Sequence, residues 1–127
     1  MKLFSILSLL FLILVFSHDS AAQSKTRVRF ARGATSATLS GTIKGYAYRD
    51  YTFSAKPGQQ LSVRLSSKNA SLEIVVRNPA GENLNSGGTT WNDEIASTGT
   101  YLVRVLLPRA AARRRESAAF RLTIEIE

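Results

Sequence analysis

The sequence predicts an all-β protein: an antiparallel, jelly-roll-like β-sandwich of seven or eight strands, with a short helical turn before the last strand. Apolar residues recur at every second position in several short segments, a pattern typical of strands that bury one face. Glycine, proline and asparagine separate these segments at short intervals, and no long segment shows the period of an amphipathic helix. Short strands at regular spacing favour a sandwich.

The N-terminal segment, residues 1–22, is predicted to be a signal peptide. Lys2 gives it a positive start, residues 3–16 form an apolar run with two serines, and small residues at 20–22 precede the expected cleavage site. The apolar run is shorter than the roughly 18 to 20 residues that a membrane span needs, which disfavours a retained anchor. We therefore expect one β-sandwich domain at 23–127, with no membrane association after cleavage.

The strands of this domain follow from alternating apolar residues and the turns between them. We expect strands at residues 28–30, 36–45, 46–56, 61–65, 72–76, 101–107 and 120–126. Turn-forming residues at 56–59, 78–81 and 97–99 mark breaks between strands. The Gly- and Asn-rich segment 83–92 is expected to form a surface loop.

Two aromatic features stand out among these elements. Tyr46, Tyr48 and Tyr51 fall within six residues, and in a strand Tyr46 and Tyr48 would share one face. Their rings could pack in the sheet or contact a partner. Trp91, the only tryptophan, follows a Gly-rich stretch; it could stack on a sugar from a loop, or pack against the sandwich.

A cluster of arginines lies before the last expected strand. If the alanines at 110–112 allow a helical turn, Arg109 and Arg113 lie at i and i+4 and present two guanidinium groups on one face. Such a pair can bind carboxylates or phosphates through two parallel hydrogen bonds each. Arg114 and Arg115 add further charge. The alternative interpretation is a solvated basic loop.

Composition limits the chemistry of the predicted domain. The formal net charge is +8, and it stays at +8 without residues 1–22, because these hold one lysine and one aspartate. Strongly basic exported proteins usually meet acidic partners.

The chain has no cysteine and its only histidine is His18, so Ser-His-Asp and Cys-His catalysis and the usual zinc sites are excluded from 23–127. Asp93 and Glu94, adjacent in sequence, would point to opposite faces of a strand. We expect no enzyme, cofactor or metal.

Two blocks of sequence resemble the bacterial inhibitors of goose-type (g-type) lysozyme. The first is GTIKGYAYRDYTF at 41–53 with AKPGQ at 55–59; the second is GTYLVRV at 99–105, RAAAR at 109–113 and the final strand through 120–126. The resemblance implies a periplasmic β-sandwich that blocks the active-site cleft of a g-type lysozyme and binds no nucleic acid. It places the contact residues at Tyr46, Arg109 and Arg113. Tyr48, Arg114, Arg115 and Trp91 are further candidates.

Other functions remain open at this point. Residues 66–97 do not follow the inhibitor pattern, and their turns resemble a secreted accessory sandwich found after bacterial peptidases. A glycan- or peptidoglycan-binding module would use Trp91 and the basic surface. A structural or adhesive sandwich would need neither an enzyme target nor a specific glycan.

Overall fold

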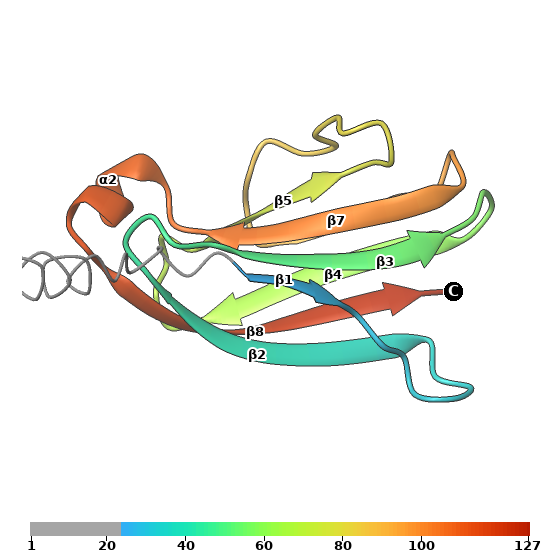
Figure 1. The fold of residues 1–127 in the computed structure, drawn as a ribbon, viewed down its shortest axis with the longest axis horizontal. Helices are drawn as coiled ribbons and strands as arrows, with labels where there is room; N and C mark the ends of the chain where they lie inside the picture. Colours follow the sequence, from blue (N-terminus) through green and yellow to red (C-terminus); the bar gives the residue numbers. More distant parts are fainter. Residues whose placement is uncertain (1–23) are drawn as a thin grey trace, which may run out of the picture.

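The computed structural model describes residues 24–127 as two stacked four-stranded sheets (Figure 1). The first sheet has the order β1-β3-β7-β5, with β1 at Ser24–Arg27, β3 at Arg49–Ala55, β7 at Gly99–Leu106 and β5 at Glu73–Arg77. The second has the order β2-β8-β4-β6, with β2 at Ser36–Lys44, β8 at Ser117–Ile126, β4 at Gln60–Ser67 and β6 at Thr90–Glu94. The predicted β-sandwich is confirmed, whereas the predicted signal peptide at 1–22 lies outside the described residues.

The core lies between the sheets and is built from the alternating residues that the sequence singled out. Leu61 and Val63 of β4, in one sheet, and Ile74 and Val76 of β5, in the other, are all fully buried. Aromatic rings fill the wider space: Phe53 and Tyr101 stack with ring centroids 6.1 Å apart, and Tyr51 meets Phe120 edge to face at 6.4 Å. This close packing makes the sandwich a rigid scaffold. No helix in residues 24–127 is long and apolar enough to span a membrane.

The first strand differs from its prediction in position and direction. It spans Ser24–Arg27, not 28–30, and it runs parallel to β3, whereas the other strand pairs among the described residues are antiparallel. Val28 follows it with a buried side chain, and its N–H donates to the carbonyl oxygen of Thr52 at 2.8 Å. The apolar residues at 28–30 therefore mark where the chain leaves the sheet.

Two further boundaries differ for local reasons. The strand expected at 46–56 begins only at Arg49, because Gly45 and Tyr46 form a turn in which Gly45 has φ +61°. The expected loop at 83–92 ends in strand β6, in which Trp91 pairs with Val63 and packs against the core. Only one apolar residue of β6 faces inward, so alternation could not reveal the strand.

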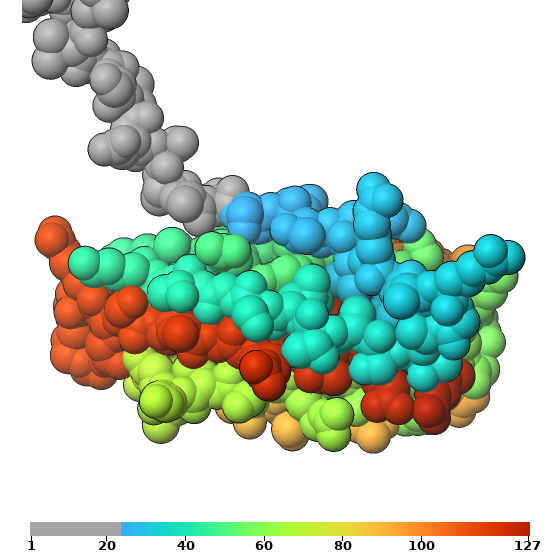
Figure 2. Space-filling model, turned by 90° about the horizontal axis from the view of Figure 1, so that it is seen from below, coloured from blue at the N-terminus to red at the C-terminus, as the bar shows by residue number. Residues whose placement is uncertain are grey.

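The predicted helical turn is helix α2, Arg109–Arg113, in the connection from β7 to β8. That connection crosses from one sheet to the other at the end of the sandwich where the β2–β3 turn also lies (Figure 1). Seen from below, β2, β8 and β4 lie side by side across one broad face, and the α2 connection closes its end (Figure 2). Two segments distant in sequence thus meet at one end of the molecule.

Candidate functional site

Helix α2 presents Arg109 and Arg113 outward, as the i and i+4 spacing predicts. Its inner residues, Ala111 and Ala112, are each 1% exposed and belong to the core. The Ala112 N–H donates to the Pro108 carbonyl oxygen at 2.9 Å, which closes the turn. Both arginines are exposed, and neither forms an ion pair with another residue of 24–127. The buried Ala111 and Ala112 thus hold helix α2 against the core, and the opposite face of the helix presents the two guanidinium groups.

The β2–β3 turn brings Tyr46 next to this helix. The Gly45 N–H donates to the Glu116 carbonyl oxygen at 3.0 Å, and Lys44 pairs with Ser117 at the end of the β2–β8 ladder. A methyl group on Gly45 would lie 3.7 Å from the Ala112 carbonyl oxygen, so the turn and the helix are in direct contact. Tyr46 itself is 66% exposed, which is unusual for so large an apolar ring.

A groove of about 600 Å³ runs between the turn and the helix. Its lining consists of Lys44, Gly45, Tyr46, Ala47, Ala112, Arg113 and Arg115. The structure therefore brings Tyr46 and Arg113 together, and it adds Arg115. Arg109 lies one helical turn away from Arg113, beside the groove and not in its lining.

Tyr48 lies beneath an arginine and does not share the exposed position of Tyr46. The guanidinium carbon of Arg104 sits 3.8 Å from the centroid of the Tyr48 ring. The same guanidinium donates to both carboxylate oxygens of Asp50, from Nε at 2.8 Å and from Nη2 at 2.9 Å. Asp50 is only 5% exposed, and its hydrogen bond raises the pKa of Arg104 above its ordinary value. The expectation that Tyr46 and Tyr48 share a strand face is wrong, because both precede β3.

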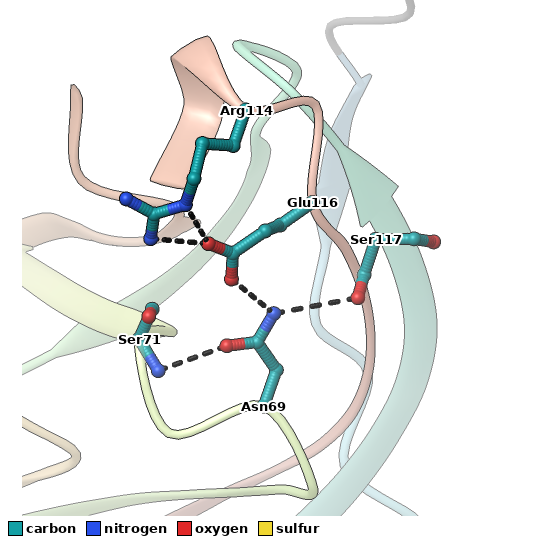
Figure 3. Close-up of polar contacts among 5 residues, drawn as sticks. All are labelled: Asn69, Ser71, Arg114, Glu116 and Ser117. Carbon is teal, nitrogen blue, oxygen red and sulfur yellow. Dashed lines mark hydrogen bonds and ion pairs between the residues drawn. The ribbon is translucent and has the colours of Figure 1, made fainter. Parts of the chain in front are cut away.

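Arg114 belongs to a separate polar network at the end of α2 (Figure 3). Its Nε donates to Glu116 Oε2 at 2.9 Å, and Asn69 Nδ2 donates to Glu116 Oε1 at 3.1 Å. Asn69 Oδ1 in turn accepts from the Ser71 N–H at 2.9 Å. The hydrogen bond from Arg114, followed by that from Asn69, holds the pKa of Glu116 below its usual range. This network ties the end of the helix to the β4–β5 loop and neutralises one arginine.

Arg115 has an uncommon backbone conformation. Its φ is +56°, and it is the only residue other than glycine with positive φ in 24–127. Its N–H donates to the Ala112 carbonyl oxygen at 3.0 Å, and the Glu116 N–H donates to that of Ala111 at 3.2 Å. These two bonds form a Schellman motif, whose left-handed position is normally glycine.

Trp91 lies apart from the groove, on edge strand β6 of the second sheet. It is half-buried against the core and lines a small pocket of about 110 Å³ with Leu84, Ile95 and Tyr101. Asp93 and Glu94 follow it on the same strand. No group of three histidine, cysteine, aspartate or glutamate residues within 24–127 could hold a metal ion.

Sequence reasoning did not identify Asp50, Arg104 and Asn69 as residues that support the site. Asp50 and Arg104 lie 54 positions apart, and Asn69 and Glu116 lie 47 apart. Only the register of β3 with β7, and the packing of the β4–β5 loop, bring them together. A single sequence carries no signal for either pairing.

Together, the fold and the groove define a β-sandwich binding protein with a preformed cationic surface at one end. The chain is 34% identical to the inhibitor of g-type lysozyme of Escherichia coli K12, over 94% of each chain. It belongs to the family of bacterial inhibitors of g-type lysozyme. The relatives are inhibitors, which confirms that the protein is not an enzyme, and the solved relatives are periplasmic, which confirms the predicted location.

Solved structures agree with this assignment. The periplasmic g-type lysozyme inhibitor PliG of Aeromonas hydrophila superposes with a TM-score of 0.76 at 29% identity, over 83% of this chain and 97% of that chain. The pre-peptidase C-terminal domain of a Bacillus anthracis collagenase shares the fold alone, with a TM-score of 0.56 at 11% identity, over 84% of this chain and 97% of that one. The turns that resemble an accessory sandwich are therefore features of a shared fold. No family model matches the sequence.

Proposed function

We propose that this protein inhibits a g-type lysozyme in the periplasm by covering the active-site cleft of the enzyme with Tyr46, Arg109 and Arg113. Glycoside hydrolases generally act through a pair of carboxyl groups in the cleft that binds the sugar chain. Such a cleft offers acidic acceptors to a basic partner. The protein, with a formal net charge of +8, has the complementary charge.

The two arginines suit carboxylates because they are charged, exposed and held in place. Each guanidinium can donate two parallel hydrogen bonds to one carboxylate. Helix α2 is fixed through the buried Ala111 and Ala112, so little backbone freedom is lost when a partner binds. Loss of one partner from a desolvated charge pair typically costs about 2 to 5 kcal/mol, which corresponds to roughly 30-fold or more in affinity.

Tyr46 supplies the apolar contact. Tyrosine and arginine are enriched among residues that dominate interfaces, because each combines a large contact area with directional hydrogen bonding. Tyr46 is exposed yet rooted in a turn that is hydrogen-bonded to the α2–β8 connection. Its ring can occupy the space of a sugar, and its hydroxyl can reach a polar group of the cleft.

One observation carries the proposal: the Gly45 N–H donates to the Glu116 carbonyl oxygen, which joins the turn that carries Tyr46 to the connection between α2 and β8. By contrast, Trp91 is half-buried at the other sheet edge and gives no comparable support to a glycan-binding module.

The test is a titration of the protein, purified from the periplasm, into a g-type lysozyme that clears a peptidoglycan suspension. We expect 1:1 inhibition of the g-type enzyme, with hen-type and invertebrate-type enzymes as comparisons. Arg109→Ala, Arg113→Ala and Tyr46→Ala should each weaken inhibition. Arg64→Ala is the matched control, because Arg64 is exposed on the outer face of β4, away from the groove. Equal potency of all four variants would place the contact surface elsewhere.

A further inference from the structure

The end of helix α2 contains an arginine where the backbone favours glycine. In a Schellman motif the residue after the C-cap adopts a left-handed conformation, which glycine reaches without steric conflict. Arg115 occupies this position with φ +56°. All other positive-φ residues in the described part of the chain are glycines. The backbone thus accommodates a side chain at a position that disfavours one, and such positions are concentrated at functional sites.

Arg114 and Arg115, although adjacent, have different surroundings. Arg114 donates to Glu116 on the side that faces Asn69 (Figure 3). Arg115 lines the same groove as Tyr46 and forms no ion pair with any residue of 24–127. The left-handed conformation of Arg115 changes the direction of the chain. The guanidinium of Arg114 therefore binds Glu116 at the helix end, whereas Arg115 lies along the groove.

We propose that Arg115 is a fourth contact residue, and the third arginine among them, which binds a carboxylate of the lysozyme beside the Tyr46 ring. The lining of the groove also includes the small apolar residues Ala47 and Ala112 and a second guanidinium, that of Arg113. An acidic side chain entering this groove would be shielded from water and would meet two guanidinium groups. In this position a guanidinium forms stronger hydrogen bonds than it does in open solvent. The proposal rests on the function proposed above and adds a residue to it.

The decisive variant is Arg115→Gly, because stability and inhibition should change in opposite directions. Glycine removes the steric conflict at positive φ, so the melting temperature should rise by roughly 4 °C. Loss of the guanidinium should at the same time weaken inhibition by about tenfold or more. A residue with a merely structural role would not produce this combination, since relief of backbone strain would leave the inhibition constant unchanged.

Two further variants separate charge from backbone flexibility. Arg115→Asn keeps a residue that tolerates the left-handed conformation without the freedom of glycine, and it should weaken inhibition as much as Arg115→Gly. Arg64→Ala is the matched control: it removes one exposed positive charge on β4, away from the groove and from the network that fastens helix α2, and should leave the inhibition constant within about twofold.

The outcomes distinguish this inference from the proposed function. If Arg115→Gly and Arg115→Asn inhibit as well as the unchanged protein while Arg113→Ala does not, Arg115 is not a contact residue and the proposed function stands. If variants at Tyr46, Arg109 and Arg113 also retain full inhibition, the proposed surface itself is wrong. Equal losses of inhibition for Arg64→Ala and Arg115→Gly would show that only net charge matters and would overturn the specific assignment to Arg115.

Discussion

Arg104 covers the ring of Tyr48 at 3.8 Å and at the same time binds both oxygens of the buried carboxylate of Asp50. One guanidinium therefore links the start of β3 to the middle of β7, across the register pair Asp50–Arg104. Tyr48 stands two residues after Tyr46, so this contact fixes the chain where it leaves the turn. The residues that hold the chain after Tyr46 are therefore not part of the groove lining.

Removal of this support should be costly to the fold. Arg104→Ala leaves the Asp50 carboxylate buried without its partner, which typically costs about 3 to 5 kcal/mol of unfolding free energy. Urea denaturation of the variant measures the loss. The double variant Asp50→Ala with Arg104→Ala should lose less than the sum of the single changes, because both single changes remove the same interaction. Additive losses would contradict the coupling.

Tyr46 should matter for inhibition and hardly at all for stability. The side chain is 66% exposed, so Tyr46→Ala should change the unfolding free energy by no more than about 0.5 kcal/mol. Inhibition of the g-type lysozyme should fall by about tenfold or more, as for a central interface aromatic. Tyr46→Phe keeps the ring and shows how much of the effect comes from the hydroxyl. If Tyr46→Ala lowers the unfolding free energy but leaves inhibition unchanged, Tyr46 is a structural residue and not a contact residue.

The Arg114–Glu116–Asn69 network predicts a pH dependence of stability. The pKa of Glu116 is lower in the folded protein than in the unfolded chain, where it lies near about 4.3. The network therefore stabilises the fold above that value, and the contribution is lost as the pH falls through the folded pKa. Glu116→Gln should be less stable than the unchanged protein at pH 7, and the two should converge in acid. A difference that stays constant with pH would exclude the carboxylate as its source.

Gly45 and Gly33 form a matched pair for testing the turn. Both have positive φ, at +61° and +78°, and neither has a neighbour that a methyl group would strike. Alanine at either position should cost about 1 to 2 kcal/mol through backbone strain alone. Only Gly45→Ala should also weaken inhibition, because Gly45 lines the groove and bonds to Glu116. Similar inhibition constants for the two variants would show that turn geometry does not matter for binding.

The sequence predicted those strands and the helix whose secondary structure follows from a local pattern of residues. Alternating apolar residues located β4, β7 and β8, and the alanines between Arg109 and Arg113 located α2. The edge strand β6 was missed because Trp91 is its only apolar residue. The parallel direction of β1 was missed because its residues are polar and half-buried or exposed, so its pairing leaves no periodic pattern.

The sequence named the residues of the candidate site, but it could not predict how they are arranged. The family resemblance named Tyr46, Arg109 and Arg113, but the position of Tyr46 in a turn depends on the positive φ of Gly45. The different surroundings of Arg114 and Arg115 depend on the Schellman motif and on Glu116. Such distinctions come from hydrogen bonds between segments that meet only in the folded chain.

The pairing of Lys44 with Ser117 brings together residues from the first and last thirds of the described chain. Contacts between segments that are distant in the chain form slowly. If local hairpins form first during folding, the groove therefore forms last. A partly folded chain has the tyrosine and the arginines but not their spacing. During refolding, recovery of inhibitory activity should therefore report closure of the whole sandwich, and a newly exported chain would be inert toward its target until that moment.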